Sequence, residues 1–401
     1  MKIRTITLFA GLDQLTSRTA AFAGAAREAF HVPVQSIRIA TRPFPSWWKT
    51  SHFTSLQAKE VEERGREIGA DYVSLGCVQL RHDASWLDLI PEIVSSSDRL
   101  FVSGEIADLA GHVDIGRCQA MAEIIRRVSV LQPDGFKNLY LAALANCPPG
   151  SPFFPVAYHD GGDVHFAIAV ESADILLDAI RSAGSLAEAR SILIQTIETE
   201  AGKLAKVAED LSSRFGIPCS GIDFTPAPFP TANSSATAAL EALGIPWIGA
   251  PGSLFAAAFI AEAIDRAVYP SCGFSGLMLT VLEDTVLASR AGEGVLSIGE
   301  LLSYAAVCGI GLDTVPLPGD IRKDTLTAIL MDVAALAVRL NKPLTARLLP
   351  LPGLRAGDPV HFEFDYFADG KVMPIVDEGL DHLLNQVSRL QFRSIRAVQG
   401  K

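Results

Sequence analysis

The sequence predicts an α/β protein with a parallel, or mostly parallel, sheet covered by helices. Short apolar runs rich in Val, Ile and Leu alternate with longer segments in which apolar residues recur every three or four positions. Runs that are apolar throughout are typical of strands buried on both faces. The 401 residues are 49% hydrophobic and only 20% charged, which excludes a largely disordered chain. This length allows either a large barrel or two tightly joined lobes.

Strands are predicted wherever a short apolar run is bounded by polar or turn-forming residues. The clearest runs lie at residues 3–9, 36–40, 72–79, 99–103, 138–145 and 164–170. Weaker runs lie at residues 221–225, 247–249, 277–282, 311–315 and 345–349.

Helices are predicted where apolar residues recur with a period near 3.6. Such segments are residues 55–69 and 185–215, and residues 325–340, which are apolar almost all round. Residues 249–264 are rich in alanine but shorter than the ~20 apolar residues that a bilayer requires, so they predict a buried helix and no membrane partner. Residues 377–401 are amphipathic and are expected to end in a frayed tail.

Charge and cysteine content bear on partners and location. Lys and Arg total 34 and Asp and Glu total 45, a formal net charge of −11 that disfavours nucleic acid. A local basic pocket could still bind a small anion. The apolar stretch at the amino terminus is too short and interrupted for a secretory signal, and the cysteines form no metal-finger spacing, so a cytoplasmic protein is expected. The sequence lacks the glycine patterns of nucleotide-binding sites, so no nucleotide cofactor is expected.

The string CGIGLDTVPLPGD at residues 308–320 carries several candidate catalytic residues. Asp313 is associated with a predicted strand, and Asp320 ends a turn shaped by prolines. Because α/β folds place their sites at the carboxyl ends of parallel strands, both aspartates are candidates. The alternative is that they cap a turn and a helix. Cys308 is a candidate nucleophile, with a small buried apolar residue as the alternative.

The loop Tyr-His-Asp-Gly-Gly at residues 158–162 holds a second group. His159 titrates near neutral pH and is a candidate base, with Asp160 beside it and Glu171 at the end of the next strand. Their alternative roles are those of ordinary turn and strand residues. A hard metal such as Mg²⁺ or Mn²⁺ is a further hypothesis that the spacing does not demand. Its ligands would be His159, Glu171, Asp313 and Asp320.

Two further segments could contact an anionic substrate. Cys272 and Ser275 lie in YPSCGFSG, where glycines and hydroxyls could form a backbone nest for an anion, or only a tight turn. Lys342 and Arg347 flank a short predicted strand. A buried Arg347 requires an anionic ligand or a carboxylate partner such as Asp313, and both alternatives stay open.

Several strings together resemble one family. They are CGIGLDTVPLPGD (308–320), NKPLTARLLPLPG (341–353), SCGFSGLMLTVLED (271–284), AYHDGG (157–162) and AVESADIL (169–176). In this order they resemble a widespread prokaryotic family, the domain-of-unknown-function family 711, which is also an uncharacterised protein family. The resemblance extends over nearly the whole chain. Its recurrent polar residues map to His159, Asp160, Glu171, Asp313, Asp320 and Arg347.

The resemblance implies a fold like that of the pyruvate formate-lyase group. This fold is an α/β barrel of about ten strands with the site inside, here as one domain over residues 1–401. Glycyl-radical enzymes require a glycine in a specific carboxy-terminal loop and a radical-relay cysteine. The tail around Gly400 shows no such loop, and no two cysteines are adjacent. Radical catalysis is therefore not expected.

Two function hypotheses follow. The first is a non-radical lyase or hydrolase acting on a small anionic metabolite inside the barrel. Arg347 and Lys342 would neutralise the substrate, His159 would transfer a proton, and the two aspartates of residues 308–320 would orient it or hold a metal. The second is a non-catalytic metabolite-binding or regulatory protein. Apolar helices and the adjacent Trp47 and Trp48 favour a homo-oligomer.

Overall fold

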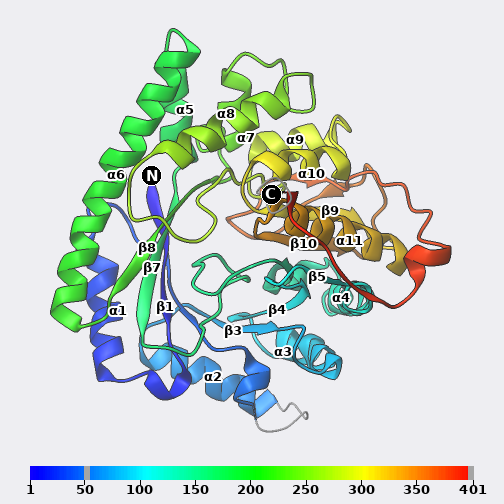
Figure 1. The fold of residues 1–401 in the computed structure, drawn as a ribbon, viewed down its shortest axis with the longest axis horizontal. Coiled ribbons are helices and arrows are strands. Elements are labelled where there is room, and N and C mark those ends of the chain that lie inside the picture. The colour runs from blue at the N-terminus through cyan, green and yellow to red at the C-terminus, as the bar shows by residue number, and fades with distance from the viewer. Residues whose placement is uncertain (49–54, 396–401) are drawn as a thin grey trace.

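The computed structural model describes residues 1–48 and 55–395, which form a large mixed sheet surrounded by helices (Figure 1). The sheet has 11 strands, and its main path runs β8-β7-β1-β2-β3-β4-β6-β10-β9. The predicted α/β class is therefore confirmed. The strands of this path are β1 (Lys2–Phe9), β2 (Ile37–Ala40), β3 (Tyr72–Val78), β4 (Leu100–Ala107), β6 (Leu141–Ala145), β7 (His165–Glu171), β8 (Cys219–Ala227), β9 (Gly311–Pro318) and β10 (Leu344–Leu351).

Strand directions divide the sheet into two sets. Strands β1, β2, β3, β4 and β6 form the first set and run parallel to one another. Strand β7 pairs antiparallel with β1, and β10 pairs antiparallel with β6. Strands β8 and β9 then continue parallel to β7 and β10. The carboxyl ends of the first set therefore lie beside the amino ends of the second set.

The two outer strands, β8 and β9, both contact one extended segment, residues 270–282. Ser271 forms an isolated parallel bridge with Ile222 of β8, and Thr280 forms one with Asp313 of β9. The predicted regular strand at residues 277–282 is wrong, because hydrogen bonds to side chains interrupt the ladder: Leu282 donates to the Thr314 hydroxyl at 3.2 Å. Residues 247–249 are also not a strand. They form a turn after Pro246, and Gly249 has a φ of 103°.

Helices cover the outside of the sheet, with α1 and α6 beside β7 and β8, and α4 and α11 on the opposite side (Figure 1). The predictions for residues 55–69, 185–215 and 325–340 are confirmed by α2, α6 and α11. No helix of the described chain is long and apolar enough to cross a membrane. The helices are α1 (Ser17–Ala29), α2 (Ser55–Glu67), α3 (Ile90–Ser96), α4 (Ile115–Ser129), α5 (Ala173–Arg181), α6 (Leu186–Phe215), α7 (Ala236–Ala242), α8 (Ser253–Arg266), α9 (Thr285–Gly292), α10 (Ile298–Val307) and α11 (Lys323–Leu340).

The long helix α6 shows how local sequence sets these elements. The Ser185 side chain accepts a hydrogen bond from the Glu188 amide and caps the first turn. Gly216 ends the helix in the left-handed conformation, which glycine adopts without a steric penalty. Its apolar residues recur every three or four positions and pack against the body of the protein. The buried ones are Ala189, Leu193, Ile197, Ala201, Leu204, Ala208 and Leu211.

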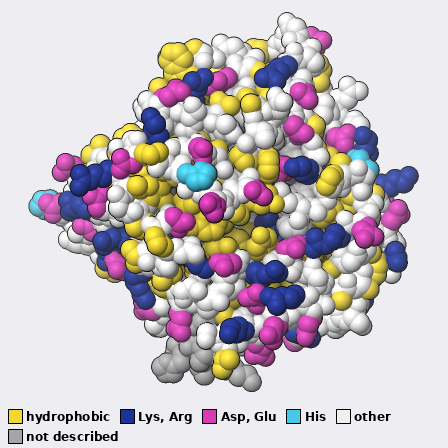
Figure 2. Space-filling model, turned by 180° about the vertical axis from the view of Figure 1, so that it is seen from behind, with side chains coloured by type: hydrophobic (Ala, Val, Ile, Leu, Met, Phe, Trp, Pro, Cys, Tyr) yellow, Lys and Arg dark blue, Asp and Glu magenta, His cyan; other side chains and the backbone are white. Residues whose placement is uncertain are grey.

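The segments outside the main path are short. Strand β5 (His112–Asp114) extends from β4 and pairs with β13 (Arg389–Gln391), and β11 (Pro359–Val360) pairs with β12 (Gly370–Lys371). The predicted tail is thus partly ordered by β13, whereas residues 396–401, including Gly400, lie outside the described residues. The face in Figure 2 shows acidic and basic side chains interspersed around a central apolar area.

The adjacent Trp47 and Trp48 make contacts within their own chain. Trp48 is buried and its ring lies 6.0 Å from that of Phe44, while the Trp47 indole donates a hydrogen bond to the Arg42 carbonyl. Both rings therefore pack this loop against the body of the protein.

The inner face of the sheet encloses a second, smaller apolar cluster. The face toward the helices contributes to one large core that extends from Ile3 to Met373. Residues from well-separated strands meet on the other face, so the sheet curves around an interior. The inner cluster contains Cys77, Ala142, Leu144, Cys147, Phe153, Val156, Tyr158, Ala227, Met278 and Ile310.

The loop between β6 and β7, residues 146–164, runs through this interior. The Thr7 hydroxyl of β1 donates to the Pro152 carbonyl at 3.2 Å, and the Ser74 hydroxyl of β3 donates to the Ala157 carbonyl at 2.7 Å. Ser151 lines a cavity on one side of the loop and Phe153 lines another on the opposite side. The loop therefore separates two cavities.

Candidate functional site

The first cavity, here named the arginine cavity, has a volume of about 160 Å³. It lies near the amino ends of the parallel strands, because Arg4 belongs to the start of β1, Arg38 to β2 and Tyr72 to β3. Arg347, which belongs to strand β10 of the second set, and Glu283 also line this cavity. The cavity is thus built from distant parts of the sequence.

A buried ion-pair network forms one wall of the arginine cavity. The Arg347 guanidinium donates through Nε to Asp313 Oδ1 at 2.6 Å and through Nη2 to Asp313 Oδ2 at 2.8 Å. Arg347 Nη2 also donates to Glu283 Oε1 at 2.9 Å. The other oxygen of Glu283 pairs with Arg4. The ion pair between Arg347 and Asp313 that the sequence left as an alternative is therefore present.

The network favours the charged forms of Arg347 and Glu283. Burial disfavours the charged form of Arg347, but the Asp313 and Glu283 carboxylates outweigh burial and raise its pKa. Burial would also raise the pKa of Glu283, but Arg4 and Arg347 outweigh it and hold that pKa below its ordinary value. At Asp313, by contrast, burial outweighs the charge of Arg347 and raises the pKa.

Arg38 adds a positive charge to the cavity without forming an ion pair of its own in the described chain. Its Nε donates to the Ser36 hydroxyl at 2.9 Å, and its guanidinium lies 5.7 Å from the Tyr72 ring centre and 5.1 Å from that of Phe154. Within residues 1–48 and 55–395, no Asp or Glu forms an ion pair with Arg38. Burial and the charge of Arg4 lower its pKa to about 10, so it remains charged at neutral pH.

Aromatic side chains form most of the remaining wall of the arginine cavity. They come from strand ends, from the loop through the interior and from the segment after β11. They are Tyr72, Phe101, Tyr140, Phe153, Phe154, Phe364 and Tyr366. Burial raises the pKa of Tyr366, so its hydroxyl stays protonated at neutral pH and can donate a hydrogen bond.

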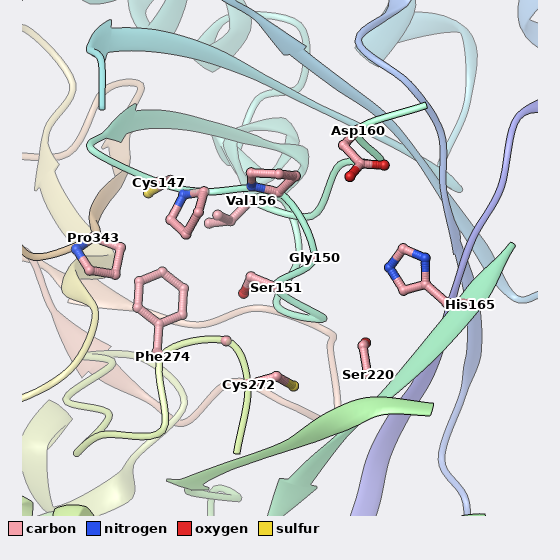
Figure 3. A pocket seen from close by; sticks show the side chains of 13 residues that line it. Cys147, Gly150, Ser151, Val156, Asp160, His165, Ser220, Cys272, Phe274 and Pro343 are labelled. Atoms are coloured by element: carbon pink, nitrogen blue, oxygen red, sulfur yellow. The ribbon is translucent and has the colours of Figure 1, made fainter. Parts of the chain in front are cut away.

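The second cavity, here named the histidine cavity, has a volume of about 360 Å³ and lies at the opposite end of the sheet (Figure 3). Cys147 follows β6, His165 begins β7 and Ser220 lies in β8. Asp160 and Cys272 also line it. This is the carboxyl end of the parallel set, but neither Asp313 nor Asp320, which were predicted at such an end, lines the cavity.

The predicted catalytic residues are divided between the two ends. His159 is fully buried behind the histidine cavity, and Glu171 pairs with Lys2 at 3.4 Å near the arginine cavity. Because β7 runs antiparallel to β1 between these two positions, they lie about 20 Å apart. In the part of the chain that is described, no three His, Cys, Asp or Glu side chains form a metal site. The set His159, Glu171, Asp313 and Asp320 is therefore not assembled.

Three other predicted residues line neither cavity. Asp320 is exposed in the turn before α11, and the N-cap position of that helix is occupied by Arg322. The Lys342 ammonium donates to the Ala305 carbonyl of α10 at 3.0 Å. Cys308 is buried, and burial raises its pKa to about 11, which leaves a thiol and no nucleophilic thiolate at neutral pH.

The predicted nest at residues 269–276 exists, but the protein's own carboxylate fills it. Asp223 of β8 accepts hydrogen bonds from the Phe274 amide at 3.0 Å and the Ser275 amide at 2.9 Å. The Asp223 carboxylate also accepts hydrogen bonds from the Thr225 amide at 3.2 Å and from the Thr225 hydroxyl at 2.5 Å. Ser275 therefore connects the extended segment to β8 and lines neither cavity.

Substituting Gly273→Ala tests the nest. Gly273 has a φ of 64°, and a Cβ there would overlap the Asp223 carboxylate. Gly294 is the control, because its φ is 75° but no atom lies within 4 Å of the added Cβ. We expect Gly273→Ala to lower the free energy of unfolding by about 1–3 kcal/mol more than Gly294→Ala, measured by urea unfolding. Equal losses of unfolding free energy in the two variants would show that the fit between this turn and the Asp223 carboxylate does not stabilise the fold.

Glu105 of β4 is a buried carboxyl group that the sequence did not single out. It is 7% exposed and accepts a hydrogen bond from the Leu80 amide at 2.6 Å. Burial raises its pKa from 4.5 to about 7, with Asp108 raising it further and Arg117 opposing the shift. The folded protein therefore retains this proton at a pH where the unfolded chain releases it.

This shift predicts a loss of stability as the pH rises. Between pH 4.5 and 7 the folded state binds more protons than the unfolded state at Glu105, so ionisation destabilises the fold as the pH increases. Glu105→Gln should remove this contribution. We expect the variant to gain about 2–3 kcal/mol relative to the wild type between pH 5 and pH 8, measured by urea unfolding. A parallel pH dependence of both proteins would contradict the assignment.

Arg4 and Arg38 are the principal residues of the arginine cavity that sequence reasoning missed. A usable signal was present, because each is a charged residue within an otherwise apolar predicted strand. The same signal had identified Arg347.

The fold and its cavities define an α/β protein with a cationic, aromatic-walled cavity at one end of a curved sheet. Its sequence matches the family described as Uncharacterised ACR (DUF711) over residues 1–365, and the chain belongs to this family. The resemblance seen in the sequence is thereby confirmed.

Relatives share the name UPF0210 protein. The one from Pyrobaculum islandicum is 35% identical over 288 residues, which cover 69% of this chain and 63% of the relative. The one from Thermoanaerobacter sp. is 29% identical over 359 residues, or 83% and 77% of the two chains. The one from Lactobacillus delbrueckii subsp. bulgaricus is 24% identical over 399 residues, or 94% and 88%. This chain thus matches less than two thirds of the length of the Pyrobaculum relative.

Proposed function

We propose that this protein binds a small organic anion in the arginine cavity and converts it as a non-radical lyase or hydrolase. The observation that carries the proposal is the charge of the cavity. Three guanidinium groups, those of Arg4, Arg38 and Arg347, line the cavity together with two carboxylates. Glu283 pairs with two of these arginines and Asp71 pairs with Arg27, but Arg38 has no acidic ion-pair partner in the described chain. A half-buried cation without a counter-charge is costly, and an anionic ligand would supply that charge.

The chemistry of the cavity fits a carboxylate or a phosphate. The planar guanidinium of Arg38 can donate two parallel hydrogen bonds to either group. The Tyr366 hydroxyl is protonated and is the candidate proton donor to a leaving or carbanionic atom. Aromatic walls exclude water and strengthen the interaction between the guanidinium groups and negative charge that develops during a reaction.

We also infer that the curved sheet closes into a barrel. The nine strands of the main path would be joined by residues 270–282, which bridge β8 and β9. The two oppositely directed sets of strands and the apolar cluster on the inner face support this closure. This would be a pyruvate formate-lyase-like barrel, formed by the chain as one domain, with the ligand inside.

One observation favours the second hypothesis, a metabolite-binding protein without catalysis. The two carboxylates that line the arginine cavity, Glu283 and Asp71, are both paired with arginines. Neither is therefore free to act as a base. Binding of an anion does not decide between the two hypotheses, whereas its chemical fate does.

Isothermal titration calorimetry with matched ligands tests the binding. The anions are acetate, benzoate and inorganic phosphate, and benzyl alcohol is the neutral control. We expect at least one anion to bind more tightly than benzyl alcohol and, at 100 times its Kd, to stabilise the fold by about 2.7 kcal/mol. Equal or absent binding across the panel would contradict the proposal. New signals in NMR spectra of the incubated ligand would then favour an enzyme, and unchanged ligand a binding protein.

A further inference from the structure

The histidine cavity has the opposite electrostatic character to the arginine cavity. Asp160 contributes a carboxylate, and no Lys or Arg is among its lining residues. In Figure 3, Asp160 and His165 face one open space, with Ser220 and Cys272 across from them. Burial raises the pKa of the Cys147 thiol to about 12 and that of Cys272 well above its ordinary value, so neither carries charge at neutral pH.

The His165 imidazole presents a hydrogen-bond acceptor at this cavity. His165 Nδ1 lies 3.0 Å from the Asp163 carbonyl, which can only accept, so Nδ1 donates. In the neutral ring Nε2 therefore carries a lone pair. The ring is held in place because it stacks on Phe9, with centres 4.7 Å apart.

His159 has the complementary tautomer. Its Nε2 donates to the Gly162 carbonyl at 3.0 Å, which leaves a lone pair on Nδ1. That nitrogen is buried, has no hydrogen-bond partner and lies 3.5 Å from Asp160 Oδ1. Burial lowers the pKa of His159, so its ring does not neutralise Asp160. Arg42 is the nearby cation, and its guanidinium pairs with Asp13 at 3.2 Å.

We propose that the histidine cavity binds a protonated amine. The Asp160 carboxylate is the counter-ion, and His165 Nε2 accepts a hydrogen bond from the ammonium group. Phe274 and Val156 line the same space and contact the apolar part of the ligand. The protein therefore has a second ligand site, for an organic cation, at the opposite ends of the strands from the arginine cavity. This site does not depend on the proposed anion site.

The test compares benzylammonium, benzyl alcohol and benzoate at pH 7.5, with binding measured by calorimetry and by ¹⁵N NMR of the histidine rings. We expect benzylammonium to bind about fivefold more tightly than benzyl alcohol and to shift the His165 Nε2 resonance. Asp160→Asn should remove this preference, because the amide keeps the shape and loses the charge. Asp163→Asn, an exposed change in the same loop, should retain it.

Several results would overturn the proposal. They are equal binding of amine and alcohol, an unchanged preference in Asp160→Asn, and a His165 shift caused by benzoate in place of the amine. The NMR titration of the wild type decides the question even if Asp160→Asn alters folding. Loss of anion binding at the arginine cavity would leave this result unaffected.

Discussion

Replacing Arg347 with methionine is expected to lower the free energy of unfolding by about 3–5 kcal/mol. The substitution keeps much of the side-chain volume but removes the cation that pairs with both Asp313 and Glu283. These carboxylates are 0% and 2% exposed, so they cannot recover their hydration. Urea unfolding at pH 7 measures the loss.

Arg389→Met is the matched control for this prediction. Arg389 also pairs with an aspartate, Asp114, at 2.7 Å, but its side chain is 47% exposed. An exposed ion pair contributes about 1 kcal/mol or less. If Arg347→Met cost no more than Arg389→Met, the buried network would not stabilise the fold as described.

Replacing Arg38 with methionine is expected to weaken anion binding by about 30- to 100-fold while leaving stability nearly unchanged. Hydrogen bonds to charged groups contribute about 1.5–3 kcal/mol each, and the variant loses the guanidinium fork. No carboxylate loses a partner, because Arg38 has none within the residues that the structure describes. Calorimetry with the tightest anion of the panel, together with urea unfolding, measures both quantities.

Arg99→Met is the control for Arg38. Arg99 lies outside the arginine cavity, and its side chain is 43% exposed. The Arg99→Met variant should bind the anion with the same affinity as the wild type. Unchanged affinity in Arg38→Met would place the anion elsewhere, and a large loss of stability would show that Arg38 holds the fold together.

The sheet was largely predictable because its strands carry their signal locally. Residues 3–9 and 164–170 are apolar runs, and both form strands close to the predicted bounds. The segment at residues 277–282 has the same pattern but does not form a regular strand. Its hydrogen bonds involve Thr314, whose φ is 45° and whose hydroxyl replaces a ladder partner. Side-chain participation of this kind leaves no mark in hydrophobic periodicity.

The site was only partly predictable, because its contacts join residues far apart in the sequence. A charge within an apolar strand indicated a partner for Arg347, and Asp313 was proposed as one. Arg4 carries the same signal, but its partner Glu283 is 279 residues away. Similarly, the nest at residues 269–276 was recognised, but its occupant Asp223 comes from β8. In such cases the residue spacing predicts that a nest forms, but it does not predict which group occupies the nest.

The proposed metal set failed for a topological reason. His159 and Glu171 are close in sequence, but β7 lies between them and carries the chain from one end of the sheet to the other. Two residues on either side of one strand are therefore close in sequence but lie at opposite ends of the sheet. The pairing of β7 with β1, which sets this direction, cannot be read from either strand alone.

Native mass spectrometry of protein purified without added organic acids tests the central claim, that the arginine cavity holds a small organic anion. We expect one small acid per chain, released on denaturation and absent from Arg38→Met. If the wild type carries no acid and none of acetate, benzoate and phosphate binds when added, the cavity is not an anion site and the central claim is wrong.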